Sequence, residues 1–500
     1  MADNPRLPKP APIQQAGPVL TPVPLTGGAY NARSVIANAQ RCVNLYPEMN
    51  PQANQAPVPV THYLTPGLML RTTLGASPIR GIYTTSRGSV FVVAAGNVYA
   101  LDSGFNATLI GTITSSSGQV SMSDNGIIVV LVDGGVGSGW TFDIVGGGFA
   151  PIVDPNFLGA NNVAFLDGFF VFALSFTSVF YLSPIYWDGI EPFDPTQIAS
   201  KSGGSDPILS IEVVRRELWL VGSLTSEVWY NSGAQDFPFE RQPGVFVEHG
   251  TAALNSVTSA DVALFFLGAD RQGRGVVFML KDYQALRIST HAIEKDFQTY
   301  STITDALGFT YQQDGHTFYF LTFPTANKTW VYDMATEQWH ERTWTNPADG
   351  SENRHRAGAI TAGILSIIVG DWQNGRIYTF NLDVGADNGD LIVRRRGFPH
   401  MVHGLKRVSY VSFIADMEVG TQGGFAGTPT VFLRWSDTRG ATWGNPVALP
   451  MLYGQADQYY RSLAVRRLGM ARDRVFELYW SFANKTALNG ADIEIEPAET

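Results

Sequence analysis

The stretch Glu217–Gly233, ELWLVGSLTSEVWYNSG, decides the fold of this chain. Its first half, ELWLVGS, is a near-continuous apolar run, and a short turn separates it from EVWYNSG, which is rich in aromatic residues. Because neighbouring side chains of a strand point to opposite sides, a continuous apolar run predicts a strand that is buried on both faces. The stretch therefore predicts a β-hairpin in the interior of the protein.

The same hairpin recurs along the chain. First strands like ELWLVGS begin at Val90, Ile127, Phe169, Glu217, Leu264, Thr317 and Leu365. Aromatic-rich second strands begin at Asn97, Trp140, Ser178, Glu227, Val276, Thr329 and Arg376. A repeat of about 40–50 residues is typical of propeller blades, each of which is a four-stranded antiparallel sheet. Stacking such blades around an axis covers both faces of every sheet.

The sequence thus predicts an all-β protein with a six- or seven-bladed β-propeller over residues 79–385. The blade number stays open between six and seven, because one unit is either incomplete or closed by the N-terminal segment. A large β-sandwich or a β-helix is the competing interpretation. The constant composition of the hairpins at long spacing favours the propeller.

The segments on either side of the repeat differ from it in composition. The first 66 residues hold 12 of the 28 prolines, and proline removes backbone donors and favours extended conformations. We expect an extended proline-rich arm over residues 1–28 and, over residues 29–78, a segment that docks on or closes the propeller. Residues 386–500 keep strand patterns such as RVFELYWSFA (residues 474–483), which predict a C-terminal β-sandwich-like domain.

Composition and charge argue against several classes of function. The net charge of −10 argues against a dedicated nucleic-acid binder, which needs a basic face, although an acidic wall beside passing DNA is compatible with it. Cys42 is the single cysteine, so neither an internal disulfide nor a cysteine-based zinc site is expected. The N-terminal sequence does not resemble a signal peptide. Polar residues interrupt the apolar stretch Phe165–Trp187, which argues against a membrane helix.

Candidate chemical motifs have structural interpretations that we favour. Ser436–Trp443, SDTRGATW, partly matches the Asp-box hairpin turn of sialidases, but a threonine stands in the Asp position. His400 and His403 lack a third ligand, and strand spacing places them on opposite faces, so no metal site is expected. For His291 and Glu294, a hydrogen-bonded polar cluster is favoured over an acid–base pair. We expect neither catalytic residues nor a cofactor.

The strongest basic patch of the sequence follows the repeat. It consists of Arg394, Arg395, Arg396, Lys406 and Arg407. Such a group is either a solvated face, with salt bridges to an acidic neighbour, or a contact to another subunit or to DNA. We favour the interface and expect these residues at a subunit or DNA-facing surface.

Several phrases of the sequence resemble one family. They are RSVIANAQRCVNLYPE (residues 33–48), YLTPGLML (63–70), SEVWYNSGAQDFPFER (226–241), RISTHAIE (287–294) and TFPTANKTWVYDMATEQWHER (322–342). Together they resemble the tail-nozzle, or packaged-DNA stabilisation, proteins of short-tailed (podovirus-type) bacteriophages. The C-terminal part of the chain carries less of this resemblance.

The resemblance implies a non-enzymatic virion protein that is assembled in the host bacterial cytoplasm. Six copies would form a ring below the portal and adaptor proteins, retain the packaged double-stranded DNA and form part of the ejection channel. A tail spike, fibre or needle would attach nearby. We expect the arm to reach the adaptor ring and acidic loops to line the lumen. The alternative is a glycan-binding or glycan-cleaving, sialidase-like propeller on the host surface, which needs paired carboxylates for cleavage.

Overall fold

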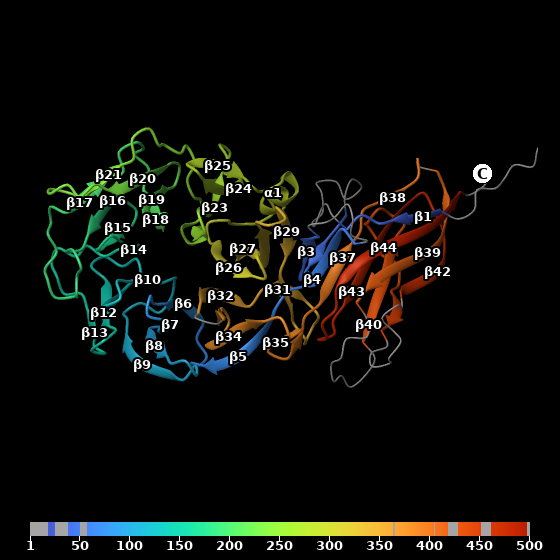
Figure 1. Ribbon diagram of the computed structural model, residues 1–500, viewed down its shortest axis with the longest axis horizontal. Coiled ribbons are helices and arrows are strands. Elements are labelled where there is room, and N and C mark those ends of the chain that lie inside the picture. The colour runs from blue at the N-terminus through green and yellow to red at the C-terminus, as the bar shows by residue number, and fades with distance from the viewer. Residues whose placement is uncertain are drawn as a thin grey trace, which may run out of the picture.

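The structure, a computed structural model, describes residues 19–25, 39–50, 58–363, 366–404, 406–418, 429–451 and 462–497. In these residues β-strands dominate, with one short helix, α1 (His291–Phe297), and one 3₁₀ turn, η1 (Leu254–Ser256). Figure 1 shows two bodies along the long axis, a ring of sheets at one end and a smaller β-domain at the other. A helix long and apolar enough to cross a membrane is absent from these residues.

The ring begins with four antiparallel blades of four strands each. Blade 1 consists of β6 (Ile79–Thr84), β7 (Val90–Ala94), β8 (Asn97–Leu101) and β9 (Ala107–Thr112). Blade 2 consists of β10 (Ser121–Asp124), β11 (Ile128–Val132), β12 (Gly139–Asp143) and β13 (Phe149–Pro151). Blade 3 consists of β14 (Asn162–Leu166), β15 (Phe169–Ala173), β16 (Val179–Leu182) and β17 (Ile198–Ser200). Blade 4 consists of β18 (Ile208–Val214), β19 (Glu217–Gly222), β20 (Ser226–Asn231) and β21 (Phe239–Arg241).

Three further blades complete the ring. Blade 5 consists of β22 (Thr258–Ala260), β23 (Ala263–Ala269), β24 (Gly275–Lys281) and β25 (Gln284–Arg287). Blade 6 consists of β26 (Leu307–Gln313), β27 (His316–Phe323), β28 (Lys328–Asp333) and β29 (Gln338–Glu341). Blade 7 consists of β32 (Ala357–Ala362), β33 (Ile367–Asp371), β34 (Arg376–Asn381) and β5 (Gly67–Thr73). The innermost strands contact one another in sequence, and β32 returns to β6.

Double burial of the second strand of each blade explains the continuous apolar runs. In β11, all five residues are buried. Val129 and Leu131 pack towards blade 1 with Phe91, whereas Val130 packs towards blade 3 with Phe170. Burying one such side chain stabilises the fold by about 1.5–3 kcal/mol. The prediction of an all-β propeller is confirmed, and within the described residues the ring has seven blades.

The propeller is closed by a strand from the N-terminal side. β5 pairs antiparallel with β34, with Met69 opposite Thr379. The Arg71 Nε donates to the Thr379 Oγ1 at 2.9 Å across a separation of 308 residues. The outermost strand of blade 7 therefore comes from a segment far from the rest of that blade in sequence.

Two facing sheets form the C-terminal domain. One contains β1 (Val19–Pro22), β3 (Leu45–Met49), β4 (Val60–Leu64), β44 (Leu488–Pro497), β39 (Val408–Met417) and β42 (Leu463–Ala471). The other contains β37 (Arg394–Gly397), β43 (Asp473–Trp480), β40 (Thr430–Ser436), β41 (Val447–Pro450) and the short β38 (Met401–Val402). Their shared core includes Phe413 and Ile493 from the first sheet and Leu433 and Phe476 from the second.

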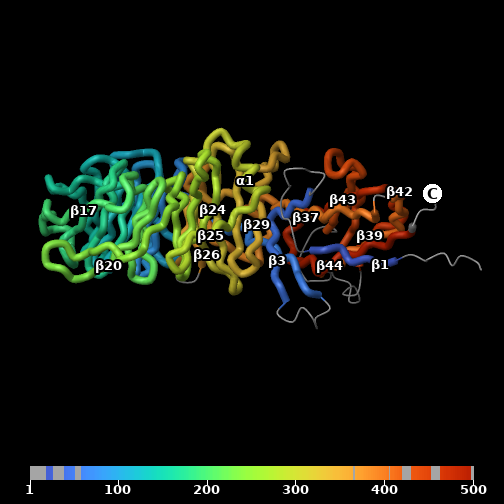
Figure 2. The backbone as a smooth tube through the Cα atoms, turned by 90° about the horizontal axis from the view of Figure 1, so that it is seen from above, coloured from blue at the N-terminus to red at the C-terminus, as the bar shows by residue number. Residues whose placement is uncertain are grey.

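One continuous sheet joins this domain to blade 6. The two-residue strand β2 (Cys42–Val43) pairs in parallel with β29 at Glu341 and antiparallel with β37 at Arg395 and Arg396. Figure 2 shows β29, β3 and β37 next to one another at the boundary of the two bodies. Two short hairpins complete the described strands: β30 (Thr343–Thr345) with β31 (Glu352–Arg354), and β35 (Ala386–Asp387) with β36 (Asp390–Leu391).

Only part of the expected N-terminal arm lies within the described residues, which exclude residues 1–18 and 26–28. In the described part, β1 pairs with β44, and the Val23 amide donates to the Ala491 carbonyl at 2.7 Å. Val23 and Leu25 are buried. This part of the arm is extended, but it completes the C-terminal sheet of its own chain.

Candidate functional site

The two bodies meet at the RCVNLYPE segment, where Asn44 is a centre of hydrogen bonds. Its Nδ2 donates to the carbonyl oxygens of Thr343, at 3.1 Å, and Val393, at 2.8 Å, and its Oδ1 accepts from the Thr343 amide at 3.0 Å. Thr343 follows blade 6 and Val393 precedes β37, so this one buried side chain ties three segments together. Its φ of 55° is left-handed, a conformation in which asparagine is enriched.

Alternating charges cross the same boundary, and we call them the charge ladder. Next to the propeller, the Arg41 Nη2 lies 2.7 Å from the Glu341 Oε2 of blade 6. The same nitrogen lies 3.0 Å from the Glu352 Oε2 of β31. The Arg395 Nη2 of the C-terminal domain reaches the other oxygen of Glu352 at 2.9 Å. Glu352 is therefore shared between cations of two different segments.

The ladder continues inside the C-terminal domain. The Arg395 Nε lies 3.7 Å from the Glu477 Oε1 on β43. The Arg434 Nη2 on β40 lies 2.6 Å from the same oxygen. Arg41, Glu341, Glu352, Arg395, Glu477 and Arg434 together form the ladder.

The pKa values of two ladder groups, Glu352 and Arg41, are shifted so that the charged forms are favoured. Burial opposes the charge on Glu352, but Arg41 and Arg395 outweigh it and lower the pKa of this carboxyl below its ordinary value. Burial also opposes the charge on Arg41, yet Glu341 and Glu352 raise the pKa of its guanidinium. A single partly exposed ion pair contributes only about 0–1 kcal/mol, so the ladder acts mainly by fixing the relative orientation of the two bodies.

Two of the five residues predicted as one basic patch are buried. Arg394 is 0% exposed and donates to the carbonyls of Ile392 and Phe482, and Arg396 is 1% exposed and donates to the Leu25 carbonyl. The prediction is therefore wrong for Arg394 and Arg396, because a side chain without exposed surface contacts neither a subunit nor DNA. The physical reason is that distant segments cover this face of β37, with Phe482 next to Arg394 and Leu25 next to Arg396.

The other three residues of that patch, Arg395, Lys406 and Arg407, do not form one group in the structure. Alternation along β37 turns Arg395 to the opposite face from its neighbours, where it joins the charge ladder. Lys406 and Arg407 are exposed on the segment before β39. Of the predicted patch, only Lys406 and Arg407 remain as a candidate contact surface. Their contact to another subunit or to DNA stays a prediction.

The Asp-box-like stretch forms a structural turn after β40. The Ser436 Oγ accepts from the Gly440 amide at 2.8 Å, as a turn-stabilising hydroxyl does. Asp437, one place before the usual Asp position, accepts from the Nε and Nη2 of Arg474 at 2.6 and 2.8 Å. Arg474 is 2% exposed, so this carboxylate neutralises a buried cation.

The His291 and Glu294 pair is part of a polar cluster that anchors α1 to blade 5. The Arg287 Nε and the Ser289 Oγ each donate to the Glu294 Oε1 at 2.7 Å. The His291 Nδ1 lies 3.6 Å from the Glu294 Oε2, and its ring is 92% exposed. Glu294 is therefore engaged in structural contacts.

Histidine chemistry elsewhere is also structural. The His400 Nδ1 lies 2.8 Å from the Asp473 Oδ1. A group of three or more histidine, cysteine, aspartate or glutamate side chains suited to a metal ion is absent from the part of the chain that the structure describes.

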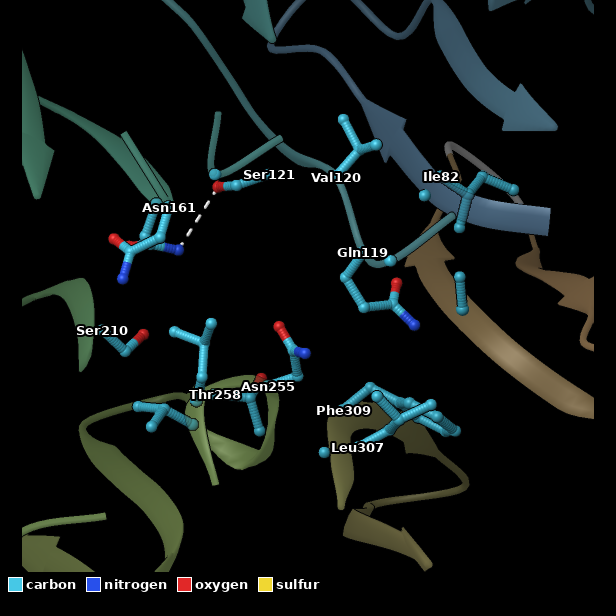
Figure 3. A pocket seen from close by; sticks show the side chains of 18 of the residues that line it. Ile82, Gln119, Val120, Ser121, Asn161, Ser210, Asn255, Thr258, Leu307 and Phe309 are labelled. Atoms are coloured by element: carbon cyan, nitrogen blue, oxygen red, sulfur yellow. Dashed lines mark hydrogen bonds between the residues drawn. The ribbon is translucent and has the colours of Figure 1, made fainter. Parts of the chain in front are cut away.

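A cavity of about 520 Å³ lies on the propeller axis, lined by residues from the inner region of all seven blades (Figure 3). Its described lining contains two ionisable residues, Asp133 and Glu212, and no arginine, lysine or histidine. Burial raises the pKa of Glu212 to about 7, an effect that a 3.1 Å hydrogen bond from Ser259 partly offsets. Recognition of a sugar carboxylate relies on cationic groups, which these lining residues do not supply.

A protein-family model described as "Bacteriophage P22 Gp10, beta-propeller" matches residues 21–385. The chain belongs to this family. Its members are β-propeller tail proteins of phages that stabilise packaged DNA, so the resemblance found in the sequence is confirmed. The coarse location, a phage virion, and a structural role agree with this membership.

Other comparisons add little to this assignment. No curated protein sequence matches the chain. Among solved structures, the WD40 β-propeller domain of Doa1 is 12% identical, covering 63% of this chain and 97% of that one at a TM-score of 0.39. The computationally designed Ika8 protein is 13% identical (63% and 100%, TM-score 0.36). A chain of the mitotic checkpoint complex is 11% identical (63% and 94%, TM-score 0.42).

We call the boundary between the two bodies, with β2, Asn44 and the charge ladder, the joint. The residues matched by the Gp10 family include its propeller side. Arg41, Asn44, Glu341 and Glu352 lie within them, whereas Arg395 and Glu477 lie beyond. Of these residues, the sequence pointed only to Arg395, as part of the basic patch, and it gave no role to the others. The phrase RCVNLYPE, which contains Arg41 and Asn44, carried part of the family resemblance. The ion pairs of Arg41 and the hydrogen bonds of Asn44 give this phrase a physical role.

Proposed function

We propose that six copies of this chain form the nozzle ring of a short-tailed phage, below its portal and adaptor rings. In this position the ring retains the packaged double-stranded DNA and forms part of the ejection channel. Tail spike, fibre or needle proteins attach to it. The observation that carries the proposal is the match of residues 21–385 to the Gp10 family.

The architecture of the subunit supports the proposal. A cyclic ring needs two different complementary patches on each subunit, held at a fixed angle. The sheet that runs from blade 6 through β2 to β37, together with Asn44 and the charge ladder, holds the two bodies in one orientation. A net charge of −10 suits a conduit that repels phosphate and lets DNA pass without gripping it.

The direct test adds the purified chain to phage capsids that contain DNA but lack the nozzle. We expect negative-stain images to show a ring of six subunits below the adaptor, and nuclease protection of the genome to rise. A chain that stays monomeric and leaves the genome unprotected would contradict the proposal. A chain with the joint disrupted by Asn44→Ala serves as the matched variant and is expected to form fewer rings.

We also propose that the N-terminal arm contacts the adaptor ring. Because β1 completes the C-terminal sheet, the cleanest variant removes residues 1–18 and keeps Val19–Pro22 in place. This deletion is expected to abolish attachment to capsids while the thermal stability of the free subunit stays unchanged. Normal attachment of the shortened chain would contradict the contact.

A further inference from the structure

The axial cavity of the propeller is a candidate ligand site that the nozzle function does not use. It has a volume of about 520 Å³, within the range of small-molecule pockets. Residues from several blades converge on it, including Gln119 from before β10, Ser210 from β18 and Asn255 from η1. In Figure 3 the amide groups of Gln119 and Asn255 extend into the cavity from opposite sides.

Hydrogen-bonding groups in the cavity are left without protein partners. The side chains of the half-buried Gln119 and the exposed Asn255 make no hydrogen bonds within the described residues, so their amides, each with two donors and one acceptor, are accessible to a ligand. The Asn161 Nδ2 donates to the Leu209 carbonyl at 3.2 Å, but its buried Oδ1 has no partner there. Buried polar atoms are normally satisfied by protein, water or a ligand, and among these three amides this applies to the Asn161 Oδ1.

An apolar wall stands beside these amides. The half-buried Leu307 and the edges of Ile82, Val120 and Phe309, each 8% exposed, line the cavity, and the Phe309 ring stacks on Phe320 at a centroid distance of 4.8 Å. Amides that donate and accept match the hydroxyl groups of a polyol, and an apolar wall matches the C–H face of a sugar ring. The described lining offers no cation, so phosphates, nucleic acids and acidic sugars lack a counter-charge.

We propose that the axial cavity binds a neutral saccharide unit through Gln119, Asn161 and Asn255. The sugar is either free or the terminal residue of a polysaccharide. The site lies within a single subunit, so it does not depend on ring assembly, and the proposed nozzle function does not depend on it.

The test uses the purified full chain and saturation-transfer NMR with titration. The probes are glucose, galactose, mannose and rhamnose, with glucuronic acid and N-acetylneuraminic acid as anionic controls. At least one neutral sugar is expected to bind with a Kd on the order of 1–10 mM, and the anionic sugars at least about tenfold more weakly. Absence of binding by all neutral sugars, or equal binding of the anionic ones, would overturn the proposal.

Variants locate the binding in the cavity. Asn255→Leu and Gln119→Leu are each expected to weaken the best sugar about tenfold, whereas Gln272→Leu, at an exposed loop between β23 and β24, leaves it unchanged. Unchanged affinity in both cavity variants overturns the site. Disaccharides and a neutral polysaccharide ending in the same sugar separate the two sources: retained binding identifies chain ends, and its loss identifies the free sugar.

Discussion

At the residue scale, Asn44 holds the joint through side-chain hydrogen bonds to segments of both bodies. Asn44→Ala removes the four side-chain hydrogen bonds of Asn44 to Thr343 and Val393 and leaves buried backbone groups unsatisfied. It also places alanine at a φ of 55°. We expect a loss of about 3–5 kcal/mol in the free energy of unfolding, measured by chemical denaturation.

A matched control separates the two contributions at Asn44. Asn388 has a similar φ of 54°, but its side chain makes no hydrogen bond within the described residues. Asn388→Ala therefore introduces only the backbone strain. We expect it to lower the free energy of unfolding by about 1 kcal/mol. Equal losses in the two variants would show that the hydrogen bonds of Asn44 contribute nothing.

Glu212 supplies a second prediction at this scale, on pH dependence. Its folded-state pKa of about 7 lies above the ordinary value of 4.5, so between these two pH values the folded state binds more protons than the unfolded state. The stability of the protein therefore falls as the pH rises from 4.5 to 7. Glu212→Gln removes this loss, and its melting temperature is expected to exceed that of the parent by about 1–3 °C at pH 8 but not at pH 4. The exposed Glu191→Gln serves as control, and a gain at both pH values would contradict the argument.

At the scale of elements, β5 decides whether the propeller is closed. A Cβ at Gly67 would lie 2.2 Å from the Val384 carbonyl oxygen and 2.5 Å from that of Ala386, both of them backbone atoms that cannot move independently. Gly67→Ala is expected to displace β5 from β34, destabilise the protein by about 2–4 kcal/mol and expose blade 7 to limited proteolysis. At Gly148 a Cβ meets nothing within 4 Å, so Gly148→Ala is the neutral control. A proteolysis pattern that is the same for both variants would contradict the closure role.

The elements also show what the sequence could and could not predict. Each hairpin carries its own burial pattern, so strands such as β11 and β19 were predictable from local apolar runs. The partner of β5 was not predictable, because its register with β34 is set by contacts such as Arg71 with Thr379, across 308 residues. Arg394 and Arg396 were misread as surface residues, because the segments that cover them, at Phe482 and Leu25, are distant from β37 in sequence.

At the scale of the whole molecule, the candidate site is the joint that makes two bodies one subunit. The family phrase RCVNLYPE marked its place in the sequence, but the partners Glu352 and Glu477 come from segments with no common motif. A charge ladder is a tertiary property, since its ion pairs join side chains of β31, β37 and β43, which come from distant parts of the chain. The N-terminal segment thus serves both bodies, closing the propeller through β5 and joining the C-terminal domain through β2 and β3.

This joint is expected to loosen in acid. The pKa of Glu352 is lowered in the folded state, so its contribution is complete above the ordinary value of 4.5 and is lost as the pH falls through the lower folded-state pKa. Glu352→Gln removes the contribution at every pH, and we expect faster amide exchange in residues 39–50 and about 1 kcal/mol less stability at pH 7. The parent is expected to approach the variant's exchange rate as the solution is acidified. Asp383→Asn is the control, because it breaks another ion pair between the two bodies, with Lys485, at a carboxylate that is 76% exposed. We expect it to change neither the amide exchange nor the stability. Equal effects of the two variants would show that the ladder is only a set of surface ion pairs and that the β2 pairing and the hydrogen bonds of Asn44 hold the joint.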